Sequence, residues 1–125
     1  MKTLYMSLLC CLIMSACGNN DSAKSNQNSQ VYVPTLQVNV EIISNRVYVT
    51  TMTDMSIRDD KVGSARRAGE GHIHMYLDDR EKETVTAKVK EYADLPRGQH
   101  TLRVSLHNND HTPYDIAKTV DFDIK

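Results

Sequence analysis

The chain has 125 residues, with 15 basic and 16 acidic side chains and a formal net charge of −1 at pH 7. A nucleic-acid surface needs a concentrated basic patch, so this near-neutral balance argues against that class. Three cysteines and no tryptophan limit the possible sites further.

The first sixteen residues have the pattern of a secretory signal. Lys2 carries a positive charge, residues 6–14 are almost entirely apolar, and the small residues Ser15 and Ala16 follow. The apolar run is too short to span a bilayer, which requires about 20 residues. We therefore expect export of the remaining chain.

The tetrad Met14-Ser15-Ala16-Cys17 resembles the lipobox of bacterial lipoproteins, although Met stands where Leu is more usual. The resemblance implies a lipoprotein signal peptide at residues 1–16 and lipidation of Cys17 as the first mature residue. Acyl chains contribute about 0.8 kcal/mol per buried CH₂, so two or three would hold the protein at the outer face of the cell membrane, or at an outer membrane. The alternative is an ordinary signal cut near Ala16.

Cysteine usage then excludes several chemistries. Cys10 and Cys11 leave with the signal and Cys17 carries the lipid, so the exported domain has no free thiol and no disulfide. A cysteine nucleophile, a cysteine zinc finger and a blue-copper centre are excluded. Removal of Lys2 leaves 14 basic and 16 acidic residues, a net charge near −2.

Residues 17–30 form the next segment, which after Cys17 is rich in Asn, Ser and Gln and has no large apolar side chain. Such a composition cannot bury enough surface to offset chain entropy, so it predicts a disordered linker. Residues 31–125 are then enough for one small domain.

This domain has the alternating pattern of an all-β fold. Apolar residues alternate at Leu36, Val38, Val40 and Ile42, and Ser44-Asn45 predicts a hairpin turn into the following strand. Strands are expected at 36–42, 46–53, 71–77, 84–89, 102–106 and 120–124, with one helical turn possible near 90–93. Six or seven short strands predict an immunoglobulin-like β-sandwich.

One connection, residues 54–70, is unusually long. A loop of this size in a small domain is often functional, and it could cover the next strand as a lid, with Arg66 and Arg67 presenting charge to an anion. The alternative is a solvated excursion between two strands.

The strand Gly71-His72-Ile73-His74-Met75-Tyr76-Leu77 is the strongest candidate site. Side chains alternate between faces, so Ile73 and Met75 share one face and His72 and His74 the other. The two imidazoles would lie about 6.6 Å apart along the strand, at about 3.3 Å per residue, and could converge on one ion. Imidazole suits copper and zinc. The alternative is that both lie on a strand face with no ion.

Three further histidines follow. His107 lies on the polar face of its predicted strand, whereas His100 shares its parity with the core residues, and His111 lies in a turn at the strand end. His100 and His107 would be about 20 Å apart, so one ion cannot reach all five histidines. Either His111 or His107 could complete a site with His72 and His74.

The spaced elements Gly71-His72-Ile73-His74, Leu95-Pro96-Arg97-Gly98-Gln99-His100 and Asp110-His111-Thr112-Pro113 resemble a pattern in small exported bacterial domains, many of them uncharacterised. The resemblance implies a sandwich fold and makes His72, His74, His100 and His111 the motif histidines. The resemblance does not imply an activity. For His100 the resemblance, which makes it a motif residue, conflicts with the strand alternation. The alternation predicts a buried residue that donates to a turn carbonyl and holds a loop.

Catalysis is not expected. The His-x-His strand superficially resembles copper and zinc dismutases, but their cysteines and Gly-rich metal loop are missing. Ser105 lies on the same face as His107 without an orienting acid, so it is no nucleophile. The sequence predicts a membrane-anchored lipoprotein that binds copper or zinc. The alternative is a metal-free adhesion or interaction module that contacts an envelope protein.

Overall fold

The computed structural model describes residues 30–125. The expected signal peptide 1–16, the lipidation site Cys17 and the linker up to residue 29 lie outside the described residues. Among the described residues, no helix is long and apolar enough to cross a membrane.

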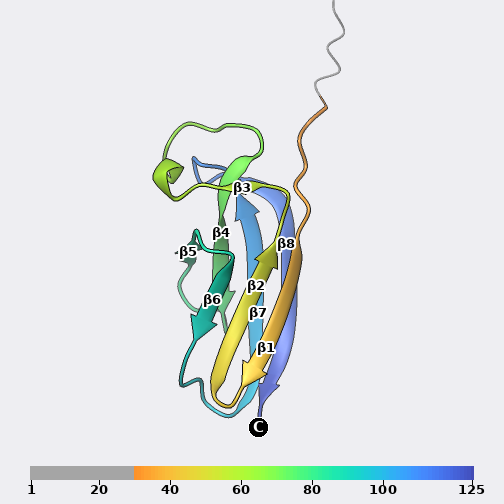
Figure 1. Ribbon diagram of the computed structural model, residues 1–125, viewed down its shortest axis with the longest axis vertical. Helices are drawn as coiled ribbons and strands as arrows, with labels where there is room; N and C mark the ends of the chain where they lie inside the picture. The colour runs from red at the N-terminus through yellow and green to blue at the C-terminus, as the bar shows by residue number, and fades with distance from the viewer. Residues whose placement is uncertain (1–29) are drawn as a thin grey trace, which may run out of the picture.

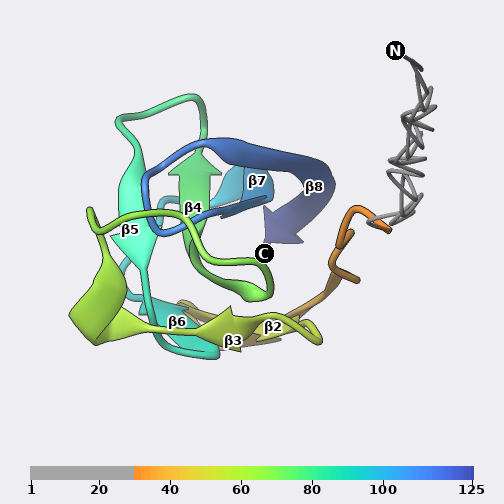
Figure 2. The same cartoon turned by 90° about the horizontal axis from the view of Figure 1, so that it is seen from above.

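Eight strands form two sheets that face each other (Figures 1 and 2). The three-stranded sheet has the order β1-β2-β6, from β1 (Gln37–Ile43), β2 (Arg46–Met52) and β6 (Val89–Tyr92). The five-stranded sheet has the order β3-β4-β7-β8, with β5 also paired to β4. Its strands are β3 (Ser56–Ile57), β4 (Glu70–Leu77), β5 (Glu83–Val85), β7 (Gly98–His107) and β8 (Pro113–Ile124). The pairing is antiparallel except between β3 and β4.

The core lies between the sheets and is built from alternate positions of the strands. Ile73 and Met75 are fully buried on one face of β4, opposite the face that carries the histidines. The main partners from the other strands are apolar as well: Val47, Val49, Leu102, Val104, Leu106, Phe122 and Ile124. This alternation places His72 and His74 on the outer face of the five-stranded sheet.

The structure confirms the all-β, immunoglobulin-like sandwich, and the hairpin at Ser44-Asn45 joins β1 to β2 as predicted. The number of strands is eight rather than six or seven. One reason is that the predicted strand 84–89 is divided. Val85 ends β5 in one sheet, whereas Val89 begins β6 in the other. Alternation continues across residues 86–88, so the sequence pattern alone does not show that the chain passes from one sheet to the other.

The helical turn considered near residues 90–93 is instead part of β6. Tyr92 pairs with Val47 and Lys90 pairs with Val49. Pairing with β2 outweighs the weak local preference for a turn, as tertiary context commonly does.

The connection 54–70 is partly structured and is attached to the end of the sandwich. It contains β3 and a 3₁₀ turn at Asp59–Lys61, and its Gly63 N–H donates to the carbonyl oxygen of Asn109 at 2.7 Å. Arg66 donates to the Thr112 hydroxyl and pairs with Asp110, while Arg67 pairs with Glu70. Both arginines are therefore engaged by the protein's own acids, and the connection supports the loop 108–112.

Candidate metal centre

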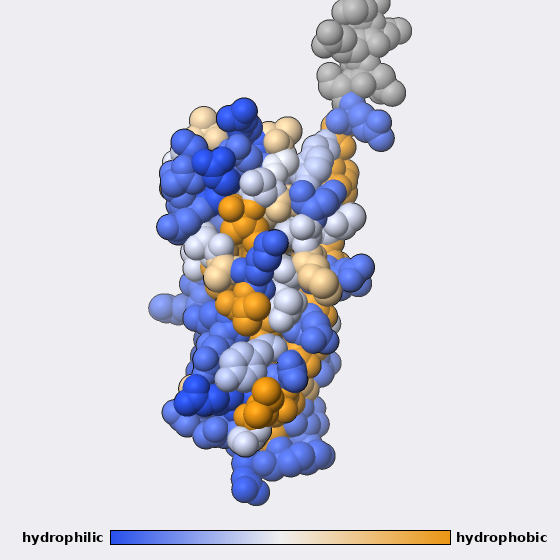
Figure 3. Space-filling model, in the orientation of Figure 1, coloured by the Kyte–Doolittle hydropathy of each residue, from blue (hydrophilic) through white to orange (hydrophobic). Residues whose placement is uncertain are grey.

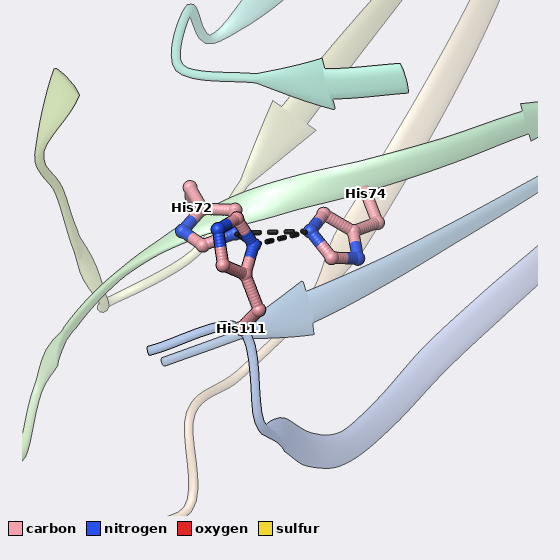
Figure 4. A group of neighbouring side chains, drawn as sticks. All are labelled: His72, His74 and His111. Atoms are coloured by element: carbon pink, nitrogen blue, oxygen red, sulfur yellow. Dashed lines mark hydrogen bonds between the residues drawn. The ribbon is translucent and has the colours of Figure 1, made fainter. Parts of the chain in front are cut away.

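Three imidazole nitrogens converge at one end of β4 (Figure 4). The Nε2 atoms of His72 and His74 lie 2.9 Å apart. The Nδ1 atom of His111 lies 3.1 Å from Nε2 of His72 and 3.4 Å from Nε2 of His74. The three atoms thus form a small triangle, with two corners from one strand and one from the loop between β7 and β8.

Hydrogen bonds alone cannot satisfy this triangle. In a neutral imidazole each ring nitrogen is either a donor or an acceptor. Among three nitrogens two must then be of the same kind, and the contact between those two is not a hydrogen bond. A cation that receives all three lone pairs removes the conflict.

The triangle also has a suitable size for an ion. With a metal-to-nitrogen distance of about 2.0–2.1 Å, ligand nitrogens lie roughly 3.3–3.6 Å apart in tetrahedral or trigonal geometry. The observed separations are 2.9–3.4 Å, so small side-chain shifts would admit a copper or zinc ion. The donor set of His72, His74 and His111 therefore fits a metal of this kind.

Burial keeps two of the three rings in the form that binds metal. His72 is fully buried and His74 is 2% exposed. Burial, reinforced by nearby imidazoles and by Lys82, lowers the pKa of His72 to about 4 and that of His74 to about 3. Both are neutral near pH 7 and offer lone pairs, while the exposed His111 closes the site from the solvent side.

His111 is positioned by the loop 108–112. Its backbone has φ of +66°, a left-handed conformation in which histidine is enriched among non-glycine residues. Its N–H donates to the Asn108 carbonyl at 3.0 Å, and Asn108 donates from its N–H and its side chain to the Thr112 carbonyl at 2.8 and 3.1 Å. These bonds hold the loop so that the imidazole points back toward β4 (Figure 4).

His107 stands beside the triangle without belonging to it. It lies opposite His72 in the β4-β7 register, and its ring stacks on His74 with centroids 3.7 Å apart. Its Nδ1 lies 2.9 Å from the carbonyl oxygen of His111, so Nδ1 must carry a hydrogen and donate it. Nε2 then accepts from the Ser105 hydroxyl at 3.1 Å. His107 therefore supports the site and has no lone pair left for an ion.

His100 lies at the opposite end of β7, away from the triangle. It is 6% exposed, and its ring stacks on Phe122. Its Nε2 faces the Pro96 carbonyl oxygen at 2.7 Å and its Nδ1 faces the Asp78 carboxylate at 2.7 Å, so both nitrogens donate. These two acceptors raise the pKa of His100. The structure thus supports the parity-based prediction of a buried histidine that holds a turn.

Two residues around the triangle, Lys82 and Asn109, carry no signal in the sequence that indicates their place there. Lys82 follows β4 and acts electrostatically on His72, His74 and His107, yet nothing in its sequence context indicates this. Asn109 lies among turn residues in the sequence, yet it is 1% exposed and donates to the Glu70 carboxylate at 3.2 Å. Both positions depend on strand pairing, which residue patterns do not fix.

The comparisons with known proteins support the fold and leave the site unassigned. A scan against protein-family models and a search of curated proteins find no match. Among solved structures, the chain is similar to the PKD1 domain of Vibrio anguillarum Epp, with a TM-score of 0.52 and 9% sequence identity. The match covers 77% of this chain and 98% of that one. At this identity the likeness shows an immunoglobulin-like sandwich and no more.

Proposed function

We propose that this protein is an exported, lipid-anchored sandwich domain that binds one copper or zinc ion through His72, His74 and His111. The observation that carries the proposal is the triangle of three imidazole nitrogens separated by 2.9–3.4 Å. Export and lipidation at Cys17 rest on the sequence pattern of residues 1–17.

The chemistry of the donor set narrows the choice of ion. In the part of the chain that the structure describes, residues 30–125, the converging group consists of three imidazoles. It includes no carboxylate and no thiolate. Oxygen-rich sites suit magnesium and calcium, whereas imidazole suits copper and zinc. The role we assign is binding rather than catalysis, because the imidazole of His107, which faces the Ser105 hydroxyl, is oriented by the carbonyl oxygen of His111 and not by a carboxylate.

The decisive measurement is metal-dependent stability of the full chain, purified without a histidine tag. An ion that binds only the native state stabilises it by about 2.7 kcal/mol at a concentration of 100 times Kd. We expect one equivalent of Cu²⁺ or Zn²⁺ to bind and to raise Tm by several degrees or more. The pair His72→Ala/His74→Ala should abolish the rise. If neither ion moves Tm in the unmodified chain, the proposal fails.

Two single variants sharpen this experiment. His111→Asn removes one imidazole but retains a residue that tolerates φ near +66°, so the metal-induced rise should shrink while the loop keeps its conformation. His100→Gln removes a histidine outside the triangle. It should lower Tm of the metal-free chain and leave the metal-induced rise unchanged.

A second candidate, a metal-free interaction module, is favoured by three apolar side chains that are exposed on the three-stranded sheet. Ile43, Met52 and Val89 on the three-stranded sheet are 53%, 50% and 51% exposed. Figure 3 shows separated apolar areas among polar side chains on the face seen in Figure 1. A photo-crosslinker at Val89 should then capture one defined envelope protein, and Met52→Asp should prevent the capture. No capture in intact cells would argue against this role.

A further inference from the structure

The Nδ1 atoms of His72 and His74 are buried, and among residues 30–125 they have no hydrogen-bonding partner. The Nε2 atoms of the same rings meet in the triangle, so an ion there receives the Nε2 lone pairs and each Nδ1 must carry the ring hydrogen. Figure 4 shows the Nδ1 atom of His74 directed away from the triangle. Two of the three candidate ligands thus have an N–H group that donates to nothing.

This arrangement is unusual for a histidine that binds a divalent metal. Such a histidine almost always donates its second ring hydrogen to a carboxylate, a carbonyl oxygen or water, and the hydrogen bond makes the ring a more basic ligand. A divalent ion polarises the N–H group more strongly than a monovalent ion does. The missing acceptors therefore weaken the binding of a divalent ion more than that of a monovalent one.

The surroundings of the triangle also leave the charge of an ion without a partner. Among residues 30–125, the only histidine that pairs with a carboxylate is His100, at the opposite end of β7. His72 is fully buried and His74 is 2% exposed, so water solvates these ligands poorly. The cost of transferring an ion from water to such surroundings scales with the square of its charge, so for equal radii a monovalent ion incurs about one quarter of the cost of a divalent ion.

From this geometry we infer that the histidine triangle selects Cu⁺ over Cu²⁺ and Zn²⁺. Cu⁺ has the smallest charge of the three ions, and its filled d shell, like that of Zn²⁺, imposes no preferred geometry on the imidazoles. The inference rests on the proposed function, because it names the ion that His72, His74 and His111 hold. It makes the protein a binder of reduced copper.

The test measures three affinities of the full chain, purified without a histidine tag, in one buffer. Cu⁺ is supplied without oxygen in the presence of ascorbate, and its affinity is measured by competition with bicinchoninate. The affinities for Cu²⁺ and Zn²⁺ are measured by competition with chelators of known affinity. Hydrogen-bond partners of metal ligands contribute about 10- to 100-fold to affinity, so we expect Kd for Cu⁺ to be at least about tenfold below Kd for either divalent ion.

Two variants at Thr84 test the cause of this preference. Thr84 is exposed on β5 and lies directly opposite His74 in the β4-β5 register, so the two side chains share a face. Thr84→Asp places a carboxylate beside His74, whereas Thr84→Asn places a neutral side chain of similar shape there. The aspartate should strengthen the binding of Zn²⁺ and Cu²⁺ and reduce the preference for Cu⁺ about tenfold. The asparagine should change the preference much less, because it supplies no charge.

The outcomes separate this inference from the proposed function. If Cu⁺ binds no more tightly than Zn²⁺ or Cu²⁺, the inference is overturned and binding of a copper or zinc ion stands. If Thr84→Asp and Thr84→Asn change the preference equally, the missing carboxylate is not its cause and the argument for the inference is overturned. Failure of all three ions to bind overturns the proposed function itself.

Discussion

At the scale of single residues, the five histidines differ in which ring nitrogens keep a lone pair. Within residues 30–125, the ring nitrogens of His72, His74 and His111 that meet in the triangle have no hydrogen-bonding partner other than one another. His100 gives both ring hydrogens to acceptors. His107 donates one hydrogen and accepts another. The hydrogen bonds around the five histidines thus divide them into three candidate metal ligands, one doubly donating structural residue and one supporting residue.

The support given by His107 leads to a prediction. His107→Phe retains a ring to stack on His74 but removes the hydrogen bond to the His111 carbonyl oxygen. Residues that orient metal ligands typically contribute 10- to 100-fold to affinity, so Cu²⁺ affinity should fall by roughly that factor. His107→Asn, whose amide can donate from a position near Nδ1, should recover part of the loss. Isothermal titration of all three chains measures this, and equal affinities would contradict it.

His100 leads to a prediction about pH. Its pKa is raised by the Pro96 carbonyl and the Asp78 carboxylate, so the folded chain holds this proton more tightly than the unfolded chain. The resulting stability is fully present below about pH 6.5 and is lost as pH rises through the folded pKa. The stability difference between the unmodified chain and His100→Gln should therefore be larger at pH 5.5 than at pH 9. Urea unfolding at both values measures it, and a pH-independent difference would contradict it.

At the scale of elements, the site depends on how closely β4 approaches β7. A Cβ atom added to Gly71 would overlap the carbonyl oxygen of His107, so only glycine allows this approach. His72 follows directly and lies opposite His107 in the register. The close packing of β4 against β7 therefore requires glycine at position 71, directly before the first candidate ligand.

Gly71→Ala should consequently separate β4 from β7. Overpacking costs typically 1–3 kcal/mol, and here the backbone itself must move, so we expect a loss of stability at the upper end of that range together with weaker metal binding. Gly69→Ala is a matched control: it lies two residues earlier with φ of +79°, and no atom lies within 4 Å of an added Cβ. It should lower stability through backbone strain alone and leave metal affinity unchanged. Equal effects of the two variants on affinity would argue against the close approach as the cause.

The elements also show where residue patterns are informative. Period-two alternation suffices to place His72 and His74 on one face and Ile73 and Met75 on the other, because direction in a strand depends only on parity. The turn residues around His111 correctly indicate the end of a strand. Patterns do not reveal the β4-β7 register, the bulge after Ser105, or the positive φ of His111, since these are set by contacts between distant segments.

At the scale of the whole molecule, the sandwich itself was predictable because many short alternating segments leave few other ways to bury one core. The division of residues 84–89 between the two sheets was not predictable, because alternation does not indicate which sheet a strand joins. The same limit applies to Lys82 and Arg103. Their positive charges act on His107 only because the tertiary fold brings these residues together. Residue patterns thus indicate candidate ligands more readily than they indicate the residues that surround those ligands.

The buried imidazoles also determine how the metal-free molecule responds to acid. The folded chain keeps the pKa values of His72 and His74 at about 4 and 3, whereas the unfolded chain protonates both near pH 6.5. Stability from these groups is present above about pH 6.5 and is lost as pH falls toward 4, at roughly 1.4 kcal/mol per pH unit for each imidazole. His74→Gln removes one titrating ring, so its stability should fall less steeply over this window. Urea unfolding of both chains at pH 4.5, 5.5 and 6.5 measures how the free energy of unfolding changes with pH. The carboxylates titrate in both chains, so the difference between the two slopes reports on His74. Parallel curves would show that His74 takes up its proton as readily in the folded chain as in the unfolded one.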